Sequence, residues 1–451
     1  MTMKKQNLRY MKWIGKMIVL LFIFNFQFSI FDCSAQRVSL DECLEKALES
    51  NFSIKIIRNE ARMDKNNLNY STFLPTLEGT AKQTQTRNDT KTENSAGEVN
   101  KMSDVKTDNY TAGVALNWRI FDGLEMFTTH EKQKELLAMG ELAVQQAVEN
   151  LILNVSAAYY NVLVQHHKLM AARHSLELSN ERYDEARVRY KIGNRSGLEP
   201  QQAKIDLNTD SSTYVRQKEA LKSAYITLNK LMNTDLQMVN YVQDTILLGP
   251  QLVLGTLEQK TLAGNTTLLI AKKDQKISAL DLKNARAVLF PTLDFNSGYN
   301  YNKTDTPSSS TTLNRSNGFY WGFSLNVPIF SRLQNRTKIK NAKLELENTE
   351  FSYQEAEKET LGDLALMYNS YENNLLMVNF EIESASVAEA NLDAALEKYK
   401  IGSLSGIEFR EFQRSYIDAV DRKLSAIYQA KVSELSLLLL SGDIRGSFVV
   451  E

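Results

Sequence analysis

The chain is poor in proline, in cysteine and in net charge. Its 451 residues include six prolines and two cysteines, and the formal net charge is −1. No proline falls inside a long helix-prone run, so the sequence permits helices far longer than those of ordinary globular proteins. The near-zero charge gives no indication of a polyanionic partner such as nucleic acid.

A long apolar run is missing from everything after the first 35 residues. No later stretch reaches the ~20 apolar residues that a membrane-spanning helix needs. If the mature chain enters a membrane, we therefore expect it to do so as part of a closed β-barrel, because lipid offers no partners for the unpaired backbone of an open sheet.

The segment 1–35 has the three parts of a secretory signal peptide. A basic region that ends at Lys16 is followed by the apolar run Met17–Phe31 and by three small residues that end at Ala35. We expect cleavage after Ala35. Two alternatives stay open. One is an uncleaved anchor, for which the run is short, and the other is lipidation of Cys33, for which the preceding Asp32 is unfavourable.

The chain contains its own pattern twice. Arg189–Glu199 resembles Lys398–Glu408, and Ala115–Phe121 resembles Ser324–Phe330 at the same offset. Such an internal repeat sets the architecture. Each half is predicted to form a helix, a β-hairpin, a very long helix, a tight turn and a returning helix. The predicted ranges are 36–232 for the first repeat, with hairpin 76–121 and helices 123–190 and 198–232; 233–255 for a packed equatorial linker; 256–441 for the second repeat, with hairpin 292–330 and helices 334–400 and 405–441; and 442–451 for a tail.

The predicted strands alternate between apolar and polar side chains. Along Phe319–Ile329, aromatic and aliphatic residues share one face, and Tyr320, Gly322, Ser324 and Asn326 share the other. This pattern fits a strand with lipid on one side and water on the other. The polar stretches 87–108 and 303–317 are predicted to be solvated loops at the tips of the hairpins.

The two long helices are each predicted to extend for ~100 Å. The second carries an apolar stripe from Leu361 to Tyr399 at spacings of three and four, which is typical of a coiled-coil seam. Four strands cannot close a barrel of useful bore, so a transmembrane sheet requires several chains. The fold class predicted is mixed α plus transmembrane β.

The order and doubling of these features resemble the TolC family of outer-membrane efflux proteins. The carrying motifs are Trp118–Gly123 with its partner Val327–Pro328–Ile329–Phe330, and the twin Tyr-Lys-Ile-Gly turns that begin at Tyr190 and Tyr399. The resemblance implies a trimeric β-barrel with four strands from each chain, continued by an α-helical periplasmic tunnel. It also implies a passive outer-membrane duct of a tripartite efflux or type I secretion system. Its partners would be two further copies, outer-membrane lipid, a periplasmic adaptor and an inner-membrane pump.

The resemblance also implies a periplasmic gate at the helix turns. Tyr399 matches a gate tyrosine, Glu408 and Glu411 match acidic positions around the entrance, and Glu199 matches the partner of the tyrosine. The family's gate arginine falls at Leu404, and Arg195 is a candidate substitute. The adaptor-docking positions would be Ile192, Gly193, Ser196, Gly197, Ile401, Gly402, Ser405 and Gly406.

A structural role for the two repeated glutamates stays open beside the gate. Ser405-x-x-Glu408 and Ser196-x-x-Glu199 both fit capping boxes at the start of a helix. Glu411 has no such role, and it follows Glu408 on the same helical face. The gate and the cap therefore make different predictions at Glu411.

Nothing in the sequence indicates catalysis, a metal site or a cofactor. The histidines lack zinc-motif spacing, and we expect surface or packing roles for His130, His166, His167 and His174. Cys43, the thiol left after cleavage, lies on a helical face with Leu40 and Leu44 and is expected in the core. The alternative to a duct is a secreted coiled-coil scaffold or interaction protein without channel activity.

Overall fold

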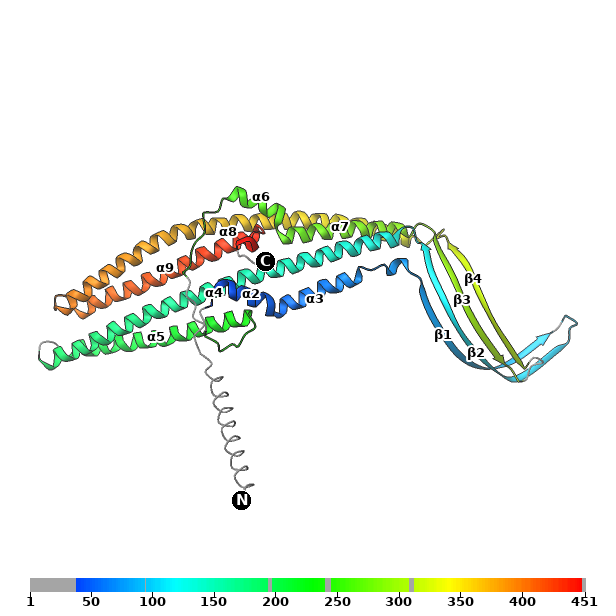
Figure 1. Cartoon of the computed structure of the whole chain (residues 1–451), viewed down its shortest axis with the longest axis horizontal. Coiled ribbons are helices and arrows are strands. Elements are labelled where there is room, and N and C mark those ends of the chain that lie inside the picture. The colour runs from blue at the N-terminus through cyan, green and yellow to red at the C-terminus, as the bar shows by residue number, and fades with distance from the viewer. Residues whose placement is uncertain (1–37, 94, 194–196, 240–244, 308–311, 448–451) are drawn as a thin grey trace, which may run out of the picture. The chain divides into compact units, whose positions relative to one another are not determined.

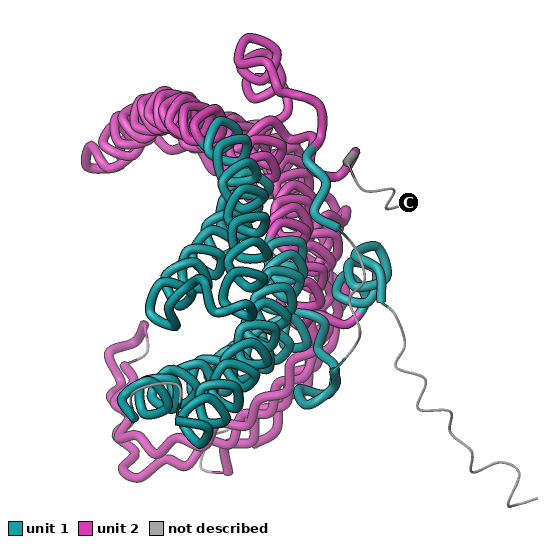
Figure 2. The backbone as a smooth tube through the Cα atoms, turned by 90° about the vertical axis from the view of Figure 1, so that its left-hand side faces the viewer, with its two compact units in different colours: residues 1–49, 154–248, 374–431 teal, residues 50–153, 249–373, 432–451 magenta. Residues whose placement is uncertain are grey.

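The structure is a computed structural model that describes residues 38–93, 95–193, 197–239, 245–307 and 312–447. The predicted signal peptide with Cys33, and the gate and turn residues Arg195 and Ser196, lie outside these ranges. The chain divides into two compact units (Figure 2). The first contains Asn154–Leu248 and Asn374–Lys431 with the segment that ends at Glu49, and the second contains the remainder. Each unit takes segments from both halves of the internal repeat, so the compact units are not the repeats themselves.

The second unit contains one antiparallel sheet in the order β1-β2-β3-β4 (Figure 1). Its strands are β1 (Thr76–Glu93), β2 (Val99–Phe121), β3 (Thr292–Asp305) and β4 (Leu313–Asn326). Pro75 and Pro291 stand directly before the first residues of β1 and β3, where a residue without an N–H ends the preceding structure. The outermost strands β1 and β4 each have one edge without a neighbouring strand among the residues that the structure describes.

The register of the sheet confirms the predicted separation into two faces. Trp118, Phe295 and Phe323 lie opposite one another on three successive strands. The neighbouring positions Asn117, Asn296 and Gly322 are aligned in the same way on the other side. Because side chains alternate along a strand, one face is aromatic and the other carries asparagine, glycine and serine. We refer to these as the aromatic face and the polar face.

The predicted loop 87–108 was wrong. β1 continues to Glu93 and β2 begins at Val99, with Arg87 opposite Lys106 and Lys91 opposite Lys101. The polar composition suggested a loop, but polar side chains exposed on both sides of a paired hairpin give the same composition, and threonine favours strands. A bulge interrupts the pairing near Asp104, which has a φ of 54° and donates its N–H to Asp89 at 2.8 Å.

The second predicted loop, 303–317, is also too long. β3 extends to Asp305 and β4 begins at Leu313. Lys303 and Arg315 are paired across the two strands, as are Asp305 and Leu313. The same physical reason applies, since the backbone pairing continues after the apolar side chains end.

The two long helices α4 (Glu125–Lys191) and α8 (Gln334–Lys400) each have 67 residues. At 1.5 Å per residue each helix is ~100 Å long, as predicted from the absence of proline within these two stretches. Asp122 caps the start of α4 by accepting the N–H of Met126 at 3.0 Å. Gly123 makes the sharp turn between β2 and α4 with a φ of 74°, and a Cβ there would lie 2.5 Å from the carbonyl oxygen of Ala287.

Shorter helices line α4 and α8 within each unit. In the second unit, α7 is tied to α4 by Lys132–Asp281 at 2.6 Å and Lys273–Glu135 at 2.7 Å. Buried Cys43 of α2, in the first unit, is 1% exposed, as predicted. The shorter elements are α2 (Leu40–Ser50), α3 (Phe52–Asn67), η1 (Ser71–Phe73), α5 (Leu198–Leu231), α6 (Leu254–Gly264), α7 (Thr266–Ala287), α9 (Gly406–Leu440) and η2 (Ile444–Ser447).

The segment predicted as a packed equatorial linker, 233–255, has no strand, and its one helical part is the start of α6, within the described residues. Leu236, Val239 and Leu247 are exposed. These three side chains do not make the predicted packing, whereas Leu248 packs against the buried cluster of Val378, Ala426 and Ala430 in the same unit. Across the described ranges, no helix combines the length and the apolar character needed to cross a membrane.

Gly298 of β3 offers a test of the sheet. It lies on the polar face, and a Cβ there would be 2.6 Å from the carbonyl oxygen of Val114 and 2.7 Å from the Tyr320 hydroxyl oxygen. We expect Gly298→Val to destabilise the sheet by about 1–3 kcal/mol, the usual cost of overpacking. Gly322→Val is the matched control, because a Cβ at Gly322 meets nothing within 4 Å on the same face. Thermal unfolding in detergent should show a lower midpoint for Gly298→Val alone, and equal midpoints would contradict the packing.

Candidate functional site at the helix turns

The two predicted Tyr-Lys-Ile-Gly turns have the same backbone geometry in the first unit. Gly193 and Gly402 have φ values of 77° and 79°, a region that glycine adopts without strain. Each donates its N–H to the carbonyl of the preceding tyrosine at 3.0 Å. Ile192 and Ile401 are 70% and 79% exposed. The turns therefore present two apolar side chains to the surroundings, each next to a hydrogen-bonded glycine.

The two turn tyrosines differ sharply in burial. Tyr190 is 52% exposed, whereas Tyr399 is 2% exposed and stacks on Phe409 with 5.2 Å between ring centroids. Burial raises the pKa of Tyr399, and the charges of Glu185 and then Glu199 raise it further. The hydroxyl has no hydrogen-bond partner in the described part of the chain. The ring of Tyr399 packs in the core, and its gate pairing with Glu199 stays a prediction.

Arg189 of α4 caps the end of α8. Its guanidinium donates to the carbonyl oxygens of Tyr399 at 3.0 Å and Lys400 at 3.3 Å. It also pairs with Glu185 at 2.5 Å and lies 5.0 Å from the centre of the Tyr399 ring. The last carbonyls of a helix lack internal partners and carry partial negative charge, so a cation stabilises them. This contact holds the end of α8 to the end of α4.

A buried ion pair joins α5 to α9. Arg410 binds Asp210 in bidentate fashion, with N–O distances of 2.6 and 2.7 Å. Gln413 donates to the backbone and hydroxyl oxygens of Ser175 at 2.8 and 2.7 Å, and Ser179 donates to Asp210 at 2.5 Å. Asp210 is 5% exposed and Gln413 is fully buried. Bidentate, charge-assisted bonds fix direction as well as distance, so this cluster sets how α4, α5 and α9 meet.

A groove lies beside this cluster, between the first turns of α5 and α9. Its volume is about 620 Å³, and its apolar lining includes Leu198, Ile205 and Ile407. Arg182 is 4% exposed at its base and pairs with Asp206. Its second terminal nitrogen has no hydrogen-bond partner within the described residues. The groove therefore joins an apolar wall to a buried cationic donor.

Glu408 is a helix cap in this structure. Ser405 donates its N–H to the Glu408 carboxylate at 2.9 Å, and the N–H of Glu408 returns to the Ser405 hydroxyl at 3.3 Å. These bonds, the backbone one first, lower the pKa of Glu408 below its ordinary 4.5. The charged Glu408 carboxylate therefore contributes its full stability above the ordinary pKa, and this contribution is lost as the pH falls through the lowered pKa. The capping box predicted at Ser405 is confirmed.

Glu411 and Leu404 complete the predicted gate positions. Glu411 is exposed and lies 3.7 Å from Arg414 on its own helix. Leu404 packs against the cluster of Leu178, Leu392 and Phe409, so an apolar contact occupies the position of the family's arginine. Sequence reasoning missed the contacts of Arg189, Asp210 and Arg410, because Arg189 and Tyr399 are 210 positions apart and Asp210 and Arg410 are 200 apart.

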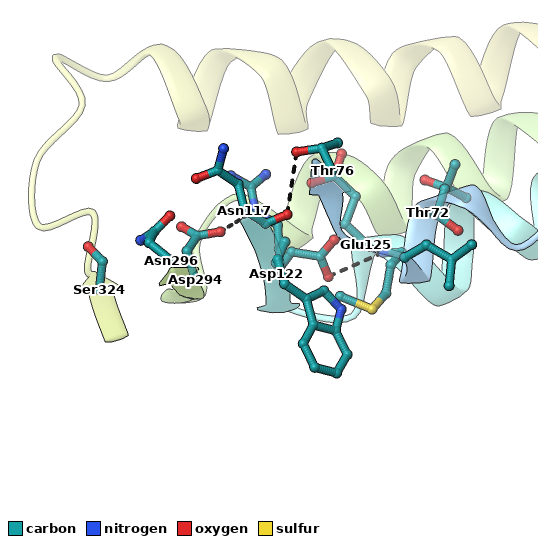
Figure 3. Close-up of a pocket in the computed structure, with 13 residues that line it drawn as sticks. Thr72, Thr76, Asn117, Asp122, Glu125, Asp294, Asn296 and Ser324 are labelled. Carbon is teal, nitrogen blue, oxygen red and sulfur yellow. Dashed lines mark hydrogen bonds and ion pairs between the residues drawn. The ribbon is translucent and has the colours of Figure 1, made fainter. Parts of the chain in front are cut away.

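A second cavity, of about 580 Å³, lies in the other unit where β2 and β3 meet α4 (Figure 3). Three of its four charged side chains have partners within the described residues. Arg119 pairs with Asp294 at 2.9 Å, and Asp122 caps α4. The Trp118 indole donates to the carbonyl of Phe73 at 2.9 Å. These contacts hold the junction of strand and helix together.

The histidines have packing roles where their contacts are described. His130 stacks on Tyr70 with ring centroids 5.3 Å apart, and His174 meets Tyr416 edge-on at 6.3 Å. His166 and His167 lie edge to face at 5.9 Å. Burial lowers the pKa of His167, which favours the neutral ring.

The Asp210–Arg410 pair gives a stability prediction. Asp210→Ala leaves the Arg410 charge buried without its partner, which costs about 3–5 kcal/mol. Glu177→Ala is the control on the same bundle, because it removes only the exposed Arg173–Glu177 pair, worth ~0.5 kcal/mol at most. Amide hydrogen exchange should accelerate around α5 and α9 in Asp210→Ala alone. Exchange equal to that of the control would show that the ion pair contributes nothing.

Comparison with known proteins gives the family. The family model described as outer membrane efflux protein matches residues 43–234 and again 257–443, which confirms the internal duplication. The probable outer membrane lipoprotein SilC of Salmonella typhimurium is 22% identical over 345 residues, 74% of this chain and 73% of that protein. The outer membrane protein TolC of Escherichia coli is 20% identical over 350 residues, 74% of this chain and 69% of TolC.

Solved structures show the same fold. The CmeC outer membrane channel of Campylobacter jejuni has a TM-score of 0.76 at 18% identity, with 90% of this chain and 86% of that one covered. The open-state MtrE outer membrane channel of Neisseria gonorrhoeae has a TM-score of 0.69 at 17% identity, with 90% and 89% covered. Family members are passive channels that form trimers and work with an adaptor and an inner-membrane pump. The chain belongs to the outer membrane efflux protein family, as an export channel of the outer membrane with its helices in the periplasm.

Proposed function

We propose that three copies of this chain form one closed barrel of about twelve strands, continued by a tunnel of their long helices. The observation that carries the proposal is the pair of open edges at β1 and β4. In lipid, unpaired backbone N–H and C=O groups cost several kcal/mol each, and only strands from other chains can pair them. The aromatic face of the sheet would then contact lipid, and the polar face would line the bore.

The assembly would act as a passive duct and not as an enzyme. Its cargo would pass from an inner-membrane pump through a periplasmic adaptor, in efflux of small molecules or in type I secretion of proteins. The adaptor would dock on the helix turns, where Ile192 and Ile401 are exposed. The other docking positions that we propose are Gly193, Gly197, Gly402, Ser405 and Gly406, with Ser196 beside them.

The periplasmic entrance would be closed by contacts between the helix pair α4–α5 and the helix pair α8–α9. Arg189 binds the end of α8 from α4, and Arg410 binds Asp210 from α9. In this chain Leu404 occupies the position of the family's gate arginine, and Arg189 and Arg410 belong to the helix ends near the same turn. We infer that they supply the link that Leu404 cannot. Tyr399, Glu199, Glu408, Glu411 and Arg195 remain the proposed gate residues around them.

Mass determination in detergent tests the assembly. We expect a mass three times that of the mature chain, with a folded barrel that changes its gel mobility on heating. The same purified protein should conduct ions when it is inserted into a planar lipid bilayer. A monomer at working concentration, or a chain removed from membranes by carbonate, would support the secreted scaffold instead.

The acidic entrance is tested at Glu411. Threefold symmetry would place about six carboxylates from Glu408 and Glu411 around one axis, which should favour cations and bind multivalent ones. We expect Glu411→Gln to weaken cation selectivity and block by multivalent cations, with the melting of the trimer nearly unchanged. Glu408→Gln is the comparison, because it also removes the cap at Ser405. Unchanged selectivity in the double variant, in an assembled trimer, would remove both residues from the gate.

A further inference from the structure

Two cations face each other on the aromatic face of the sheet. Lys303 of β3 lies directly opposite Arg315 of β4. Like charges placed directly opposite on neighbouring strands repel and destabilise the pairing. Within the described residues, neither side chain forms an ion pair with a carboxylate. The two cations therefore lie together without a carboxylate in direct contact with either, among the described residues.

The neighbouring side chains hold the cations on this face. Tyr110 of β2 is opposite Lys303, and the ammonium lies 5.3 Å from the centre of its ring. One row further along the strands, Asp108 is opposite Asp305. Asp108 is already bonded to Lys106 at 3.1 Å and to Gln85 at 2.8 Å. Two cations thus remain against the single carboxylate of Asp305.

The position of the pair along the strand indicates which surroundings supply an anion. On β4, the apolar side chains of the aromatic face run from Leu325 to Phe319 and give way to Asn317 and then Arg315. From Leu325 to Arg315 the strand rises about 33 Å, which at a tilt of ~40° is about 25 Å of height. That is the height of the apolar band of an outer-membrane barrel. In the proposed barrel, with the apolar band starting at Leu325, the cations lie at the edge of the band remote from the helices, level with the headgroups of the outer leaflet.

We propose that Lys303 and Arg315 bind a phosphate group of the phosphorylated glycolipid that anchors lipopolysaccharide in the outer leaflet. The planar guanidinium suits bidentate binding of phosphate oxygens, and the ammonium adds a point charge. The bound phosphate replaces the repulsion between the two cations with two attractions. The acyl chains of the lipid lie along Phe319 and Trp321, which are 68% and 64% exposed. The inference rests on the proposed barrel.

Lipid binding to the purified trimer tests the site. The mass of the trimer in detergent is measured first, and diphosphorylated lipid A is then titrated and its retention read by native mass spectrometry. We expect the double variant Lys303→Gln, Arg315→Gln to bind at least about tenfold more weakly, since two charge-assisted contacts are lost. Arg315→Lys, which keeps charge but loses the fork, should be intermediate.

The matched control is Lys91→Gln, Lys101→Gln. Those lysines also lie opposite each other, on the part of the β1–β2 hairpin beyond the end of β3. The control removes the same charge well outside the apolar band and should bind lipid A as the parent does. Lipid A without phosphates should bind the parent as weakly as the double variant binds the intact lipid.

Three results would overturn the site. They are equal affinity of the double variant and the parent, equal binding of the phosphate-free lipid, and equal binding of phosphatidylglycerol, which would show a general preference for anionic lipid. Failure of the trimer would be seen in the mass before any lipid is added. That result would count against the proposed function and is distinct from a trimer that binds lipid A without these residues.

Discussion

At the outer edges of β1 and β4, the backbone N–H and C=O groups have no neighbouring strand among the described residues. A lone sheet of this size cannot satisfy β1 and β4 in lipid. The internal duplication supplies two hairpins to each chain, and hence four strands with two free edges. Each hairpin also leads into one long helix, so the pairing that closes the barrel simultaneously fixes how many long helices surround the space below it. The architecture of the helical part follows from a hydrogen-bonding demand in the sheet.

The helical turns show how duplicated sequence acquires different tasks. Both turns use a glycine at positive φ, and both present an isoleucine outward. Their surroundings differ, because the position equivalent to Phe409 in the first half is Pro200, which has no ring to stack on a tyrosine. Tyr399 is consequently buried on Phe409, while Tyr190 is exposed. The same backbone turn occurs in both halves, but it is the buried tyrosine of the second half, Tyr399, that contacts Arg189.

Local signals in the sequence predicted much of the fold. Pro75 and Pro291 marked the starts of two strands, and the alternation along β4 identified its two faces. The strands beyond Arg87 were missed because polar side chains on both faces resemble a loop, and only the partner strand reveals the pairing. The capping box at Ser405 was predicted because its residues are three apart. The Asp210–Arg410 pair was not, because its partners are 200 positions apart and belong to no periodic pattern.

The charges inside each unit distinguish structural groups from groups that face a partner. Buried charges are costly unless their partners are close, and Asp210, Arg410 and Arg189 all meet that condition within the chain. Their contacts are complete, so they explain the packing of helices and need no external group. Lys303 and Arg315 differ, since the sheet places two like charges directly opposite each other and no carboxylate of the described residues contacts either one. Unlike the ion pairs of the helices, this pair lies on the exposed aromatic face of the sheet, so the anion that we propose for it comes from the surrounding membrane and not from the chain.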